Sequence, residues 1–394
     1  MVVNQIRDIF AYADRFQGQV FVIQIDYDII AHDSFPVLLQ DIVLLQQIGI
    51  RVVLVPGARR HIDEVLERYG ISSTKKNGVR VSSPEAIPFI KMAAFDAANR
   101  VMTLLSRHAV TGIIGNWVRS RGLGVIDGVD FEASGRVDSI SIDLIQSVLD
   151  DGLVPIFPCI GWSITGRPYN ISSVELASRL SIDLSAAKLF YLVGNNVLVA
   201  KDFSLPKNVF LDDTGRISRL YPDQARALLS DNTKCDEGLR FVLEGAVQAC
   251  EAGVERAHLV DGRLDGVMLE EIFTNRGAGT MIHRFPFESM RPLKESDIPA
   301  VIRLMQPAME QGILVQRSIN SILKRLQDYV VFAADQQIVG CGALHAWGED
   351  SAEIAALASD VEKGGTGVGN QILQYLIKRA ETQGFQRLFV LTTQ

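Results

Sequence analysis

Short apolar runs without alternation recur through the N-terminal part of the chain, and they restrict the fold more than any other feature. Residues 20–25, 51–55, 153–158 and 189–193 are such runs, and segments with helical patterning, such as residues 35–49, separate them. A strand that is apolar on both faces has to be covered on both faces, as in a parallel sheet between helices. The pattern therefore predicts an α/β fold with a mostly parallel, sandwiched sheet.

The pattern changes after residue 286. Residues 329–334 and 340–346 have the alternation and the intervening turn of antiparallel strands, and residues 352–358 resemble a further strand. A helix is expected at residues 370–382. These features predict a smaller α+β domain at residues 287–394, following a first domain at residues 1–286.

Composition restricts the classes of partner. Net charge is −7 and no run of basic residues occurs, so neither nucleic acid nor an anionic membrane is expected as a partner. No apolar run is long enough to span a bilayer, and the N-terminus lacks the apolar segment of a signal peptide. The four cysteines are scattered, which predicts no metal site and no disulfide framework. A cytoplasmic protein is expected.

A glycine-rich segment at residues 363–369 joins the last of these predicted strands to the helix. Its glycines leave backbone N–H groups accessible beside the positive end of the helix dipole, which suits a pyrophosphate group. Taken alone, the segment is about as compatible with a plain turn.

The residues around this loop resemble the GNAT acetyltransferases. Residues 355–358 (Ala-Ala-Leu-Ala) correspond to the strand that holds pantetheine in that family. Residues 310–315 (Glu-Gln-Gly-Ile-Leu-Val) and 387–393 (Arg-Leu-Phe-Val-Leu-Thr-Thr) resemble two segments of the bacterial N-acetylglutamate synthases. The resemblance covers nearly the whole chain. It implies acetyl transfer from acetyl-CoA to L-glutamate, giving N-acetyl-L-glutamate and CoA in the first step of arginine biosynthesis.

The resemblance also implies which residues bind acetyl-CoA. They are Leu357, Ala358, Ser359, Lys363, Gly364, Gly365, Thr366, Gly367, Val368 and Gly369. The family usually carries Arg or Gln where this chain has Gly364, and the adjacent Lys363 offers a positive charge in its place.

Acetyl transfer to an amine requires a base, because the ammonium group has to lose a proton before it attacks. Glu353 matches the family's proposed base, and a solvated strand residue is the alternative. Glutamate has two carboxylates, so a guanidinium fork is expected, and Arg317 is the candidate. Its alternative is a surface arginine. Leu314 and Thr392 are the other predicted substrate contacts.

The chain ends at Gln394, whereas the family continues with a helix and further strands. On the resemblance, the acetyltransferase domain is expected to be incomplete at its C-terminus, with an uncovered strand edge. A catalytically impaired, arginine-binding pseudoenzyme is therefore a second hypothesis.

Residues 22–27 (Val-Ile-Gln-Ile-Asp-Tyr) resemble the first strand and turn of amino-acid kinases such as N-acetylglutamate kinase. In those enzymes a lysine stabilises the transferring phosphate, and two glycines allow the backbone to approach it. Gln24 replaces the lysine, and Asp26 and Tyr27 replace the glycines. A kinase is therefore the least favoured of the three hypotheses.

Residues 258–260 and 269–280 resemble the site that binds L-arginine in arginine-sensitive synthases. A guanidinium ligand requires a carboxylate and carbonyl groups, which Glu271 and the turn at Gly277 would supply beside His258. Each residue singly has a structural alternative, but their spacing favours an effector site. Residues 6–16 resemble the helix that interlaces subunits in that family, which implies a homo-oligomer such as a hexamer.

Overall fold

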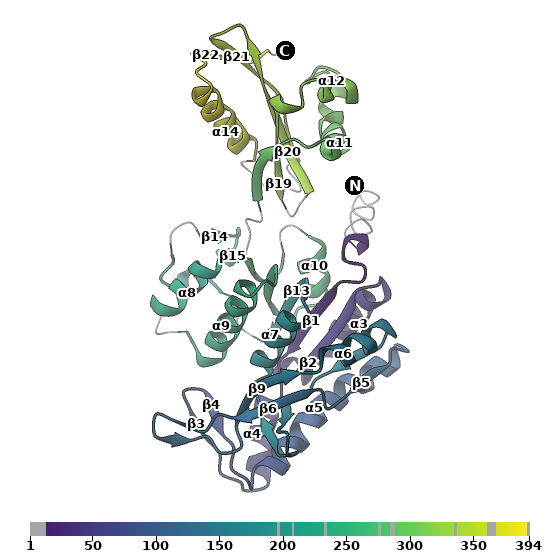
Figure 1. The fold of residues 1–394 in the computed structure, drawn as a ribbon, viewed down its shortest axis with the longest axis vertical. Helices are drawn as coiled ribbons and strands as arrows, with labels where there is room; N and C mark the ends of the chain where they lie inside the picture. Colours follow the sequence, from purple (N-terminus) through teal and green to yellow (C-terminus); the bar gives the residue numbers. More distant parts are fainter. Residues whose placement is uncertain are drawn as a thin grey trace. The chain divides into compact units, whose positions relative to one another are not determined.

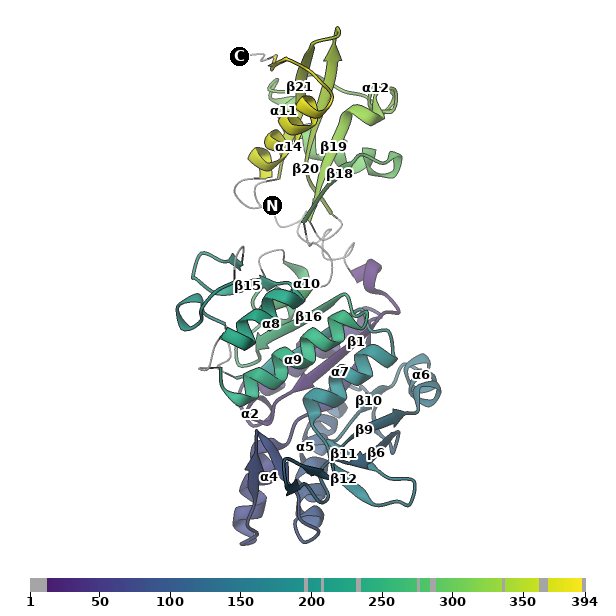
Figure 2. The same cartoon turned by 60° about the vertical axis from the view of Figure 1, so that its left-hand side comes forward.

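The computed structural model describes residues 13–194, 198–206, 209–231, 235–274, 277–283, 288–334, 337–360 and 368–391. The chain divides into two compact units, Met1–Phe285 and Pro286–Gln394 (Figures 1 and 2). Among these described residues, no helix has the length and apolar character needed to cross a membrane.

A nine-stranded sheet forms the centre of the first unit. In spatial order its strands are β14 (Phe210–Leu211), β15 (Ile217–Leu220), β17 (Thr280–His283), β16 (Arg256–Asp261), β13 (Lys188–Val193), β1 (Val20–Ile25), β2 (Arg51–Pro56), β10 (Val154–Ile156) and β5 (Gly112–Ile114). The six strands from β16 to β5 pair in parallel. Antiparallel pairing in this sheet joins β14 to β15 and β16 to β17. The predicted mostly parallel sheet is confirmed.

Helices cover both faces of this sheet, as the apolar strands require. Phe21 and Ile23 of β1 belong to one core and Val20 and Val22 to the other, so alternate residues point to opposite faces. The first core includes residues of α3 (Phe35–Gln47), α4 (Arg59–Arg68), α5 (Ile87–Arg107) and α10 (Val267–Phe273). The second includes residues of α6 (Ile142–Asp150), α7 (Ser173–Asp183), α8 (Pro222–Asp231) and α9 (Glu237–Glu251). The short helix α2 (Tyr27–Ile30) follows β1.

The first unit also contains a second sheet that the sequence did not predict. Its strands, in spatial order, are β12 (Pro168–Asn170), β11 (Ile160–Trp162), β6 (Val118–Gly122) and β9 (Gly135–Ile140). Two small hairpins join β3 (Thr74–Lys76) to β4 (Val79–Val81) and β7 (Val125–Ile126) to β8 (Val129–Asp130). These strands are short, and buried residues alternate in them with part-buried or exposed ones, so they lack the apolar runs that identify strands of the central sheet.

The second unit is built on a five-stranded sheet. Its strands, in spatial order, are β18 (Glu288–Pro292), β19 (Tyr329–Ala334), β20 (Gln337–Trp347), β21 (Ser351–Ser359) and β22 (Arg387–Phe389). Neighbours are antiparallel except for β21 and β22, which are parallel. The 3-10 turn η2 (Glu295–Asp297) follows β18, and η3 (Leu326–Asp328) precedes β19. This confirms the predicted α+β domain.

Helices lie on opposite sides of this sheet (Figure 1). The helices α11 (Ile298–Glu310) and α12 (Ile319–Leu323) pack on one face, in a core that includes Tyr329 and Ala343. The helix α14 (Val368–Thr382) packs on the other face, against Leu344 and Ile354. Residues 343, 345 and 347 of β20 therefore point to the α11 side, because side chains alternate along a strand.

Candidate functional site

A group of polar and aromatic side chains lies on the α11 face of the sheet in the second unit. His345 of β20 pairs with Glu353 of β21, and Glu353 pairs with Phe389 of β22. Directly paired residues lie on the same face of a sheet. Tyr329 of β19 extends the group, since its ring makes an edge contact with the His345 ring at 5.7 Å between centroids. Four adjacent strands thus contribute to one polar surface.

Glu353, the predicted base, is half-buried in this group. Its Oε2 accepts a hydrogen bond of 3.1 Å from Nε1 of Trp347. The Trp347 ring makes a T-shaped contact with the Phe389 ring, with centroids 6.0 Å apart. Trp347 is itself 55% exposed, so the Glu353 carboxylate lies at the border of the sheet surface and solvent. A carboxylate there is accessible to an amine or to a bridging water.

Arg317, the predicted guanidinium fork, lies just before α12 and reaches the same group. Its Nη1 donates a 3.1 Å hydrogen bond to the Tyr329 hydroxyl, and its buried Nε has no partner among the described residues. Burial raises the pKa of Tyr329, which keeps the phenol neutral. Leu314, the other predicted substrate contact described by the structure, is half-buried and packs on the α11 core. Arg317 is thus a structured side chain with an unused donor.

A bulge interrupts β21 three residues after Glu353. Ala343 pairs with Ala355 and Cys341 pairs with Ala358, so β21 carries one more residue than β20 between these pairs. Ala356 lies in the bulge with a left-handed backbone conformation, φ of +53°. Its methyl group packs in the core beneath α11. Among the described residues, the pairing of β22 with β21 runs from Ser351 to Glu353.

The predicted coenzyme-binding residues are partly described. Leu357 is 37% exposed, Ala358 is half-buried and Ser359 is exposed at the end of β21. A Cβ atom on Gly369 would lie 3.8 Å from the Ser359 hydroxyl, so the end of β21 lies beside the start of α14. The Val368 side chain is buried under the sheet, which leaves only its backbone for a ligand. Lys363, Gly364, Gly365, Thr366, Gly367 and Thr392 lie outside the described residues.

The predicted effector residues meet at one end of the central sheet in the first unit. His258 of β16 and Glu271 of α10 are buried, and His258 Nδ1 contacts Glu271 Oε1 at 2.6 Å. Glu271 Oε2 accepts hydrogen bonds of 2.6 and 2.8 Å from the backbone N–H groups of Ala278 and Gly279. The three residues named by the sequence, His258, Glu271 and Gly277, are therefore brought together.

The protonation of this pair follows from its surroundings. Burial lowers the pKa of His258 to about 4, although the hydrogen bond to Glu271 opposes this shift. Burial alone raises the pKa of Glu271, but the hydrogen bonds from His258, Gly279 and Ala278 outweigh it and the pKa is lowered. At neutral pH the pair is a carboxylate beside a neutral imidazole. A carboxylate has about four lone-pair sites, so one remains for a ligand.

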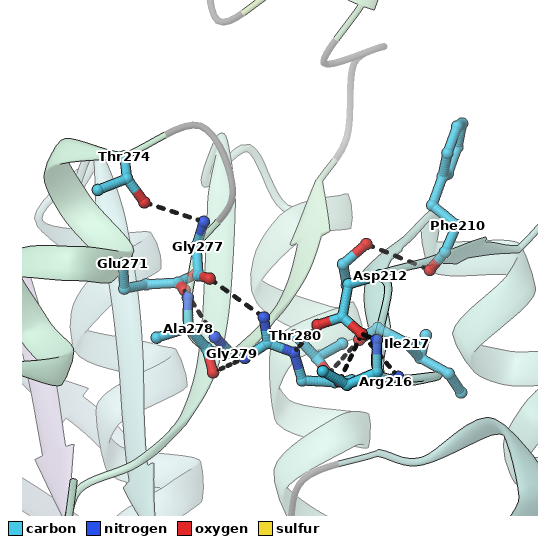
Figure 3. Close-up of polar contacts among 12 residues, drawn as sticks. Phe210, Asp212, Arg216, Ile217, Glu271, Thr274, Gly277, Ala278, Gly279 and Thr280 are labelled. Carbon is cyan, nitrogen blue, oxygen red and sulfur yellow. Dashed lines mark hydrogen bonds and ion pairs between the residues drawn. The ribbon is translucent and has the colours of Figure 1, made fainter. Parts of the chain in front are cut away.

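The turn at Gly277 supplies the carbonyl groups, and an arginine of the chain itself contacts them (Figure 3). Arg216 Nη2 donates to the Gly277 carbonyl at 3.1 Å, and its Nη1 contacts the Ala278 carbonyl. Asp212 holds the other side of Arg216, with 2.9 Å between Oδ2 and Nε. The carbonyl groups of this turn thus already contact a guanidinium, which is the ligand group that the sequence predicted for them.

The altered kinase positions lie at the end of β1. Gln24 is fully buried, and its Nε2 donates to Asp26 Oδ1 at 2.9 Å. Burial raises the pKa of Asp26, and the hydrogen bond from Gln24 offsets this shift only in part. The Tyr27 ring stacks on the His61 ring at 4.5 Å between centroids. No lysine or glycine replaces the missing kinase groups at these positions.

Sequence reasoning missed several polar residues of both groups. Arg216, His345, Asp328 and Trp347 all contact predicted residues or their neighbours. His345 stands within the apolar alternation of β20, a pattern that indicates burial and nothing about a ligand. Within the described residues, no group of three or more His, Cys, Asp or Glu side chains is arranged to hold a metal ion.

Two known families match the chain. The amino acid kinase family matches residues 22–261, and the acetyltransferase (GNAT) family matches residues 300–394. The amino-acid acetyltransferase of Aeromonas salmonicida (strain A449) is 36% identical over 406 residues, which cover 100% of this chain and 89% of the relative. The corresponding protein of Pasteurella multocida (strain Pm70) is 33% identical over 402 residues, with the same coverage.

Solved structures also match the chain. The N-acetylglutamate synthase from Neisseria gonorrhoeae complexed with coenzyme A and L-arginine superposes with a TM-score of 0.87 at 29% identity. That match covers 100% of this chain and 91% of the other. The carbamate kinase from Giardia lamblia bound to AMP-PNP covers 68% of this chain with a TM-score of 0.50 at 14% identity, a likeness of fold alone.

Proposed function

The chain belongs to the amino-acid acetyltransferase family, and from this premise we propose how its own residues perform and regulate the reaction. The second unit transfers acetyl from acetyl-CoA to the α-amino group of L-glutamate. The first unit binds L-arginine as an effector. The observation that carries the catalytic assignment is the position of Glu353, half-buried on a polar surface beside the bulge of β21.

The proposed chemistry begins with proton removal. The Glu353 carboxylate takes a proton from the α-ammonium of L-glutamate, directly or through water, and the hydrogen bond from Trp347 holds Oε2 in place. The amine then attacks the thioester carbonyl carbon, a C–N bond forms, and the C–S bond breaks as CoA leaves as its thiolate, which takes up the second proton that the nitrogen releases. We assign stabilisation of the oxyanion to backbone N–H groups of residues 357–359, of which Leu357 lies in the bulge and has no paired residue in β20.

We assign recognition of the substrate carboxylates to Arg317. Its Nη1 is fixed by Tyr329 while its Nε has no partner among the described residues, so an oriented donor remains for a carboxylate. Thr392, outside the described residues, and Leu314 stay predicted contacts. Acetyl-CoA is proposed to lie along β21 with its pyrophosphate at the start of α14. The adjacency of Ser359 and Gly369 supports that path.

The effector assignment rests on the buried pair in the first unit. Glu271 carries the negative charge and a free lone-pair site, and the turn at Gly277 presents carbonyl groups beside it. A ligand guanidinium can contact both groups, as Arg216 already contacts the carbonyls. In the solved relative, L-arginine and coenzyme A are bound together. We therefore propose feedback by L-arginine through this pair.

We further propose a homo-oligomer in the cytoplasm. The amphipathic pattern of residues 6–16, most of which lie outside the described residues, supports the oligomer, and a hexamer is the expected form. The four cysteines are buried and unpaired, which supports a reducing compartment. Analytical ultracentrifugation of the full chain tests the assembly, and a monomer at micromolar concentration contradicts it.

The experiment for the activity is identification of the product by mass spectrometry after incubation with acetyl-CoA and L-glutamate. Glu353→Gln removes the base while keeping the shape and a hydrogen-bond acceptor. Glu349→Gln, at an exposed position of the same unit, is the matched control for loss of one charge. N-acetyl-L-glutamate is expected from the unaltered chain and from the control. Equal product from Glu353→Gln refutes the role of this residue.

A further inference from the structure

His345 lies on the polar surface of the second unit, but it takes no part in the proposed proton transfer or carboxylate binding. His345 is 2% exposed, and its Nε2 is buried without a hydrogen-bond partner among the described residues. A buried acceptor or donor without a partner destabilises a protein by about 1–3 kcal/mol, so such atoms are rare and ask for an explanation. The Nε of Arg317 is a second unpartnered buried atom, on the same side of the sheet.

Asp328 determines whether His345 Nε2 is a hydrogen-bond donor or an acceptor. Its Oδ2 lies 2.7 Å from His345 Nδ1, so the ring donates through Nδ1–H to a carboxylate that only accepts. In the neutral imidazole the other nitrogen then has to be an acceptor. In the neutral ring His345 Nε2 therefore carries a lone pair in a fixed position, and the Asp328 carboxylate lies behind the ring. The combination favours a positively charged hydrogen-bond donor at Nε2.

The position of His345 identifies the kind of donor. His345 is the direct cross-strand partner of Glu353, so the two side chains project from neighbouring positions on one face. Tyr329 connects His345 to Arg317, through its ring on one side and its hydroxyl on the other. The surface therefore combines an unused acceptor with an unused guanidinium donor. An α-amino acid has the complementary pair, an ammonium and a carboxylate.

We propose that His345 Nε2 accepts a hydrogen bond from the α-ammonium of the acceptor amino acid and orients it toward Glu353. The assignment rests on the proposed function of the same surface. His345 binds the ammonium, Glu353 removes its proton, and Arg317 holds a carboxylate. His345 is thus a substrate-binding residue that selects for an amino group, and Asp328 is the residue that positions it.

The ligand pair L-glutamate and glutarate isolates this contact, because glutarate keeps both carboxylates and lacks the ammonium. Steady-state kinetics gives KM for L-glutamate, and competitive inhibition gives Ki for glutarate. In His345→Phe, KM for L-glutamate should rise about tenfold or more, the effect of losing a hydrogen bond to a charged group. Ki for glutarate and KM for acetyl-CoA should stay within about twofold of the unaltered values, because those ligands do not contact Nε2.

His345→Gln tests the same contact by rescue, because its amide oxygen can replace the Nε2 lone pair. KM for L-glutamate in His345→Gln should be well below that of His345→Phe. A purely structural role predicts instead that both variants weaken glutamate and glutarate equally, together with a lower melting temperature. That result, or an unchanged KM in His345→Phe, overturns the proposal.

Asp328→Asn tests which ring nitrogen of His345 carries the proton, without substituting His345 itself. An amide can donate to Nδ1 and so place the proton on Nε2, which turns the acceptor into a donor that repels an ammonium. A rise in KM for L-glutamate without a rise in Ki for glutarate is expected, and Glu349→Gln should change neither constant. A parallel rise in both constants in Asp328→Asn contradicts the proposal.

Failure of the proposed function can be told apart from failure of this inference. If the unaltered chain forms no N-acetyl-L-glutamate, the activity assignment fails. Ligand-induced shifts in melting temperature then still compare L-glutamate with glutarate. Loss of the shift by L-glutamate alone in His345→Phe supports an ammonium site, and equal shifts in both proteins refute it.

Discussion

Gly277, in the turn beside Glu271, is a position where one added carbon would disturb the proposed effector site directly. Its φ is +64°, in the left-handed region, and a Cβ atom there would lie 2.8 Å from Glu271 Oε2. That oxygen accepts the N–H groups of Ala278 and Gly279, so it cannot retreat without weakening both bonds. Gly277→Ala therefore combines backbone strain with displacement of the carboxylate that the arginine site requires.

Gly266 separates the two effects. It caps α10 with φ of +67°, nearly the value at Gly277, but nothing lies within 4 Å of a Cβ built on it. Gly266→Ala should thus reduce the free energy of unfolding by about 1–2 kcal/mol through strain alone. Gly277→Ala adds the weakening of two hydrogen bonds to a charged group, about 1.5–3 kcal/mol each when fully lost. A total loss of about 3 kcal/mol or more is expected.

Urea unfolding followed by tryptophan fluorescence measures these differences. Trp117 and Trp162 belong to the first unit, and Trp347→Phe removes the signal of the second unit. Calorimetry on the same proteins measures L-arginine binding, which should weaken in Gly277→Ala and stay unchanged in Gly266→Ala. Equal destabilisation by the two variants, or normal arginine affinity in Gly277→Ala, refutes the role assigned to the turn.

Three further predictions concern pH, catalysis and ligand binding. The folded-state pKa of His258, about 4, lies below the unfolded value of 6.5. The unfolded chain therefore binds a proton that the folded chain excludes, and stability complete above pH 6.5 should fall by about 3 kcal/mol toward pH 4. In His258→Phe the urea concentration at the midpoint of unfolding should depend much less on pH over this range. Glu353→Gln should lower kcat by about 10²-fold or more without changing KM for acetyl-CoA in steady-state kinetics. L-arginine at about 100 times its Kd should stabilise the first unit by about 2.7 kcal/mol in calorimetric unfolding, and Glu271→Gln should remove most of that gain.

The fold was predictable where burial leaves a continuous pattern. The strands β1, β2 and β13 are apolar on both faces, so their runs indicate a covered parallel sheet directly. The strand β6 is short and carries exposed Arg121 beside buried Ser120, so no such run marks it. Its pairing with β9 and β11 depends on contacts between distant segments, which periodicity within one segment does not report.

The grouping of His258, Glu271 and Gly277 was predictable because they belong to two adjacent segments with recognisable spacing, and their role as an effector site stays a prediction. Arg216 was not, because it contacts a carbonyl 62 residues further along the chain. His345 was missed for a related reason. Its significance comes from Asp328, 17 residues earlier, and from an unpartnered ring nitrogen, and neither is visible in an apolar strand pattern.

The most direct test of acetyl transfer under arginine control is the rate of CoA thiol release by the unaltered chain. The rate is measured with acetyl-CoA and L-glutamate, in the absence and presence of L-arginine, with Glu271→Gln beside it. Release that requires L-glutamate, changes with L-arginine and loses that response in Glu271→Gln is the expected result. Release that proceeds without L-glutamate, or that L-arginine alters equally in both proteins, contradicts the assignment of a catalytic second unit regulated through the first.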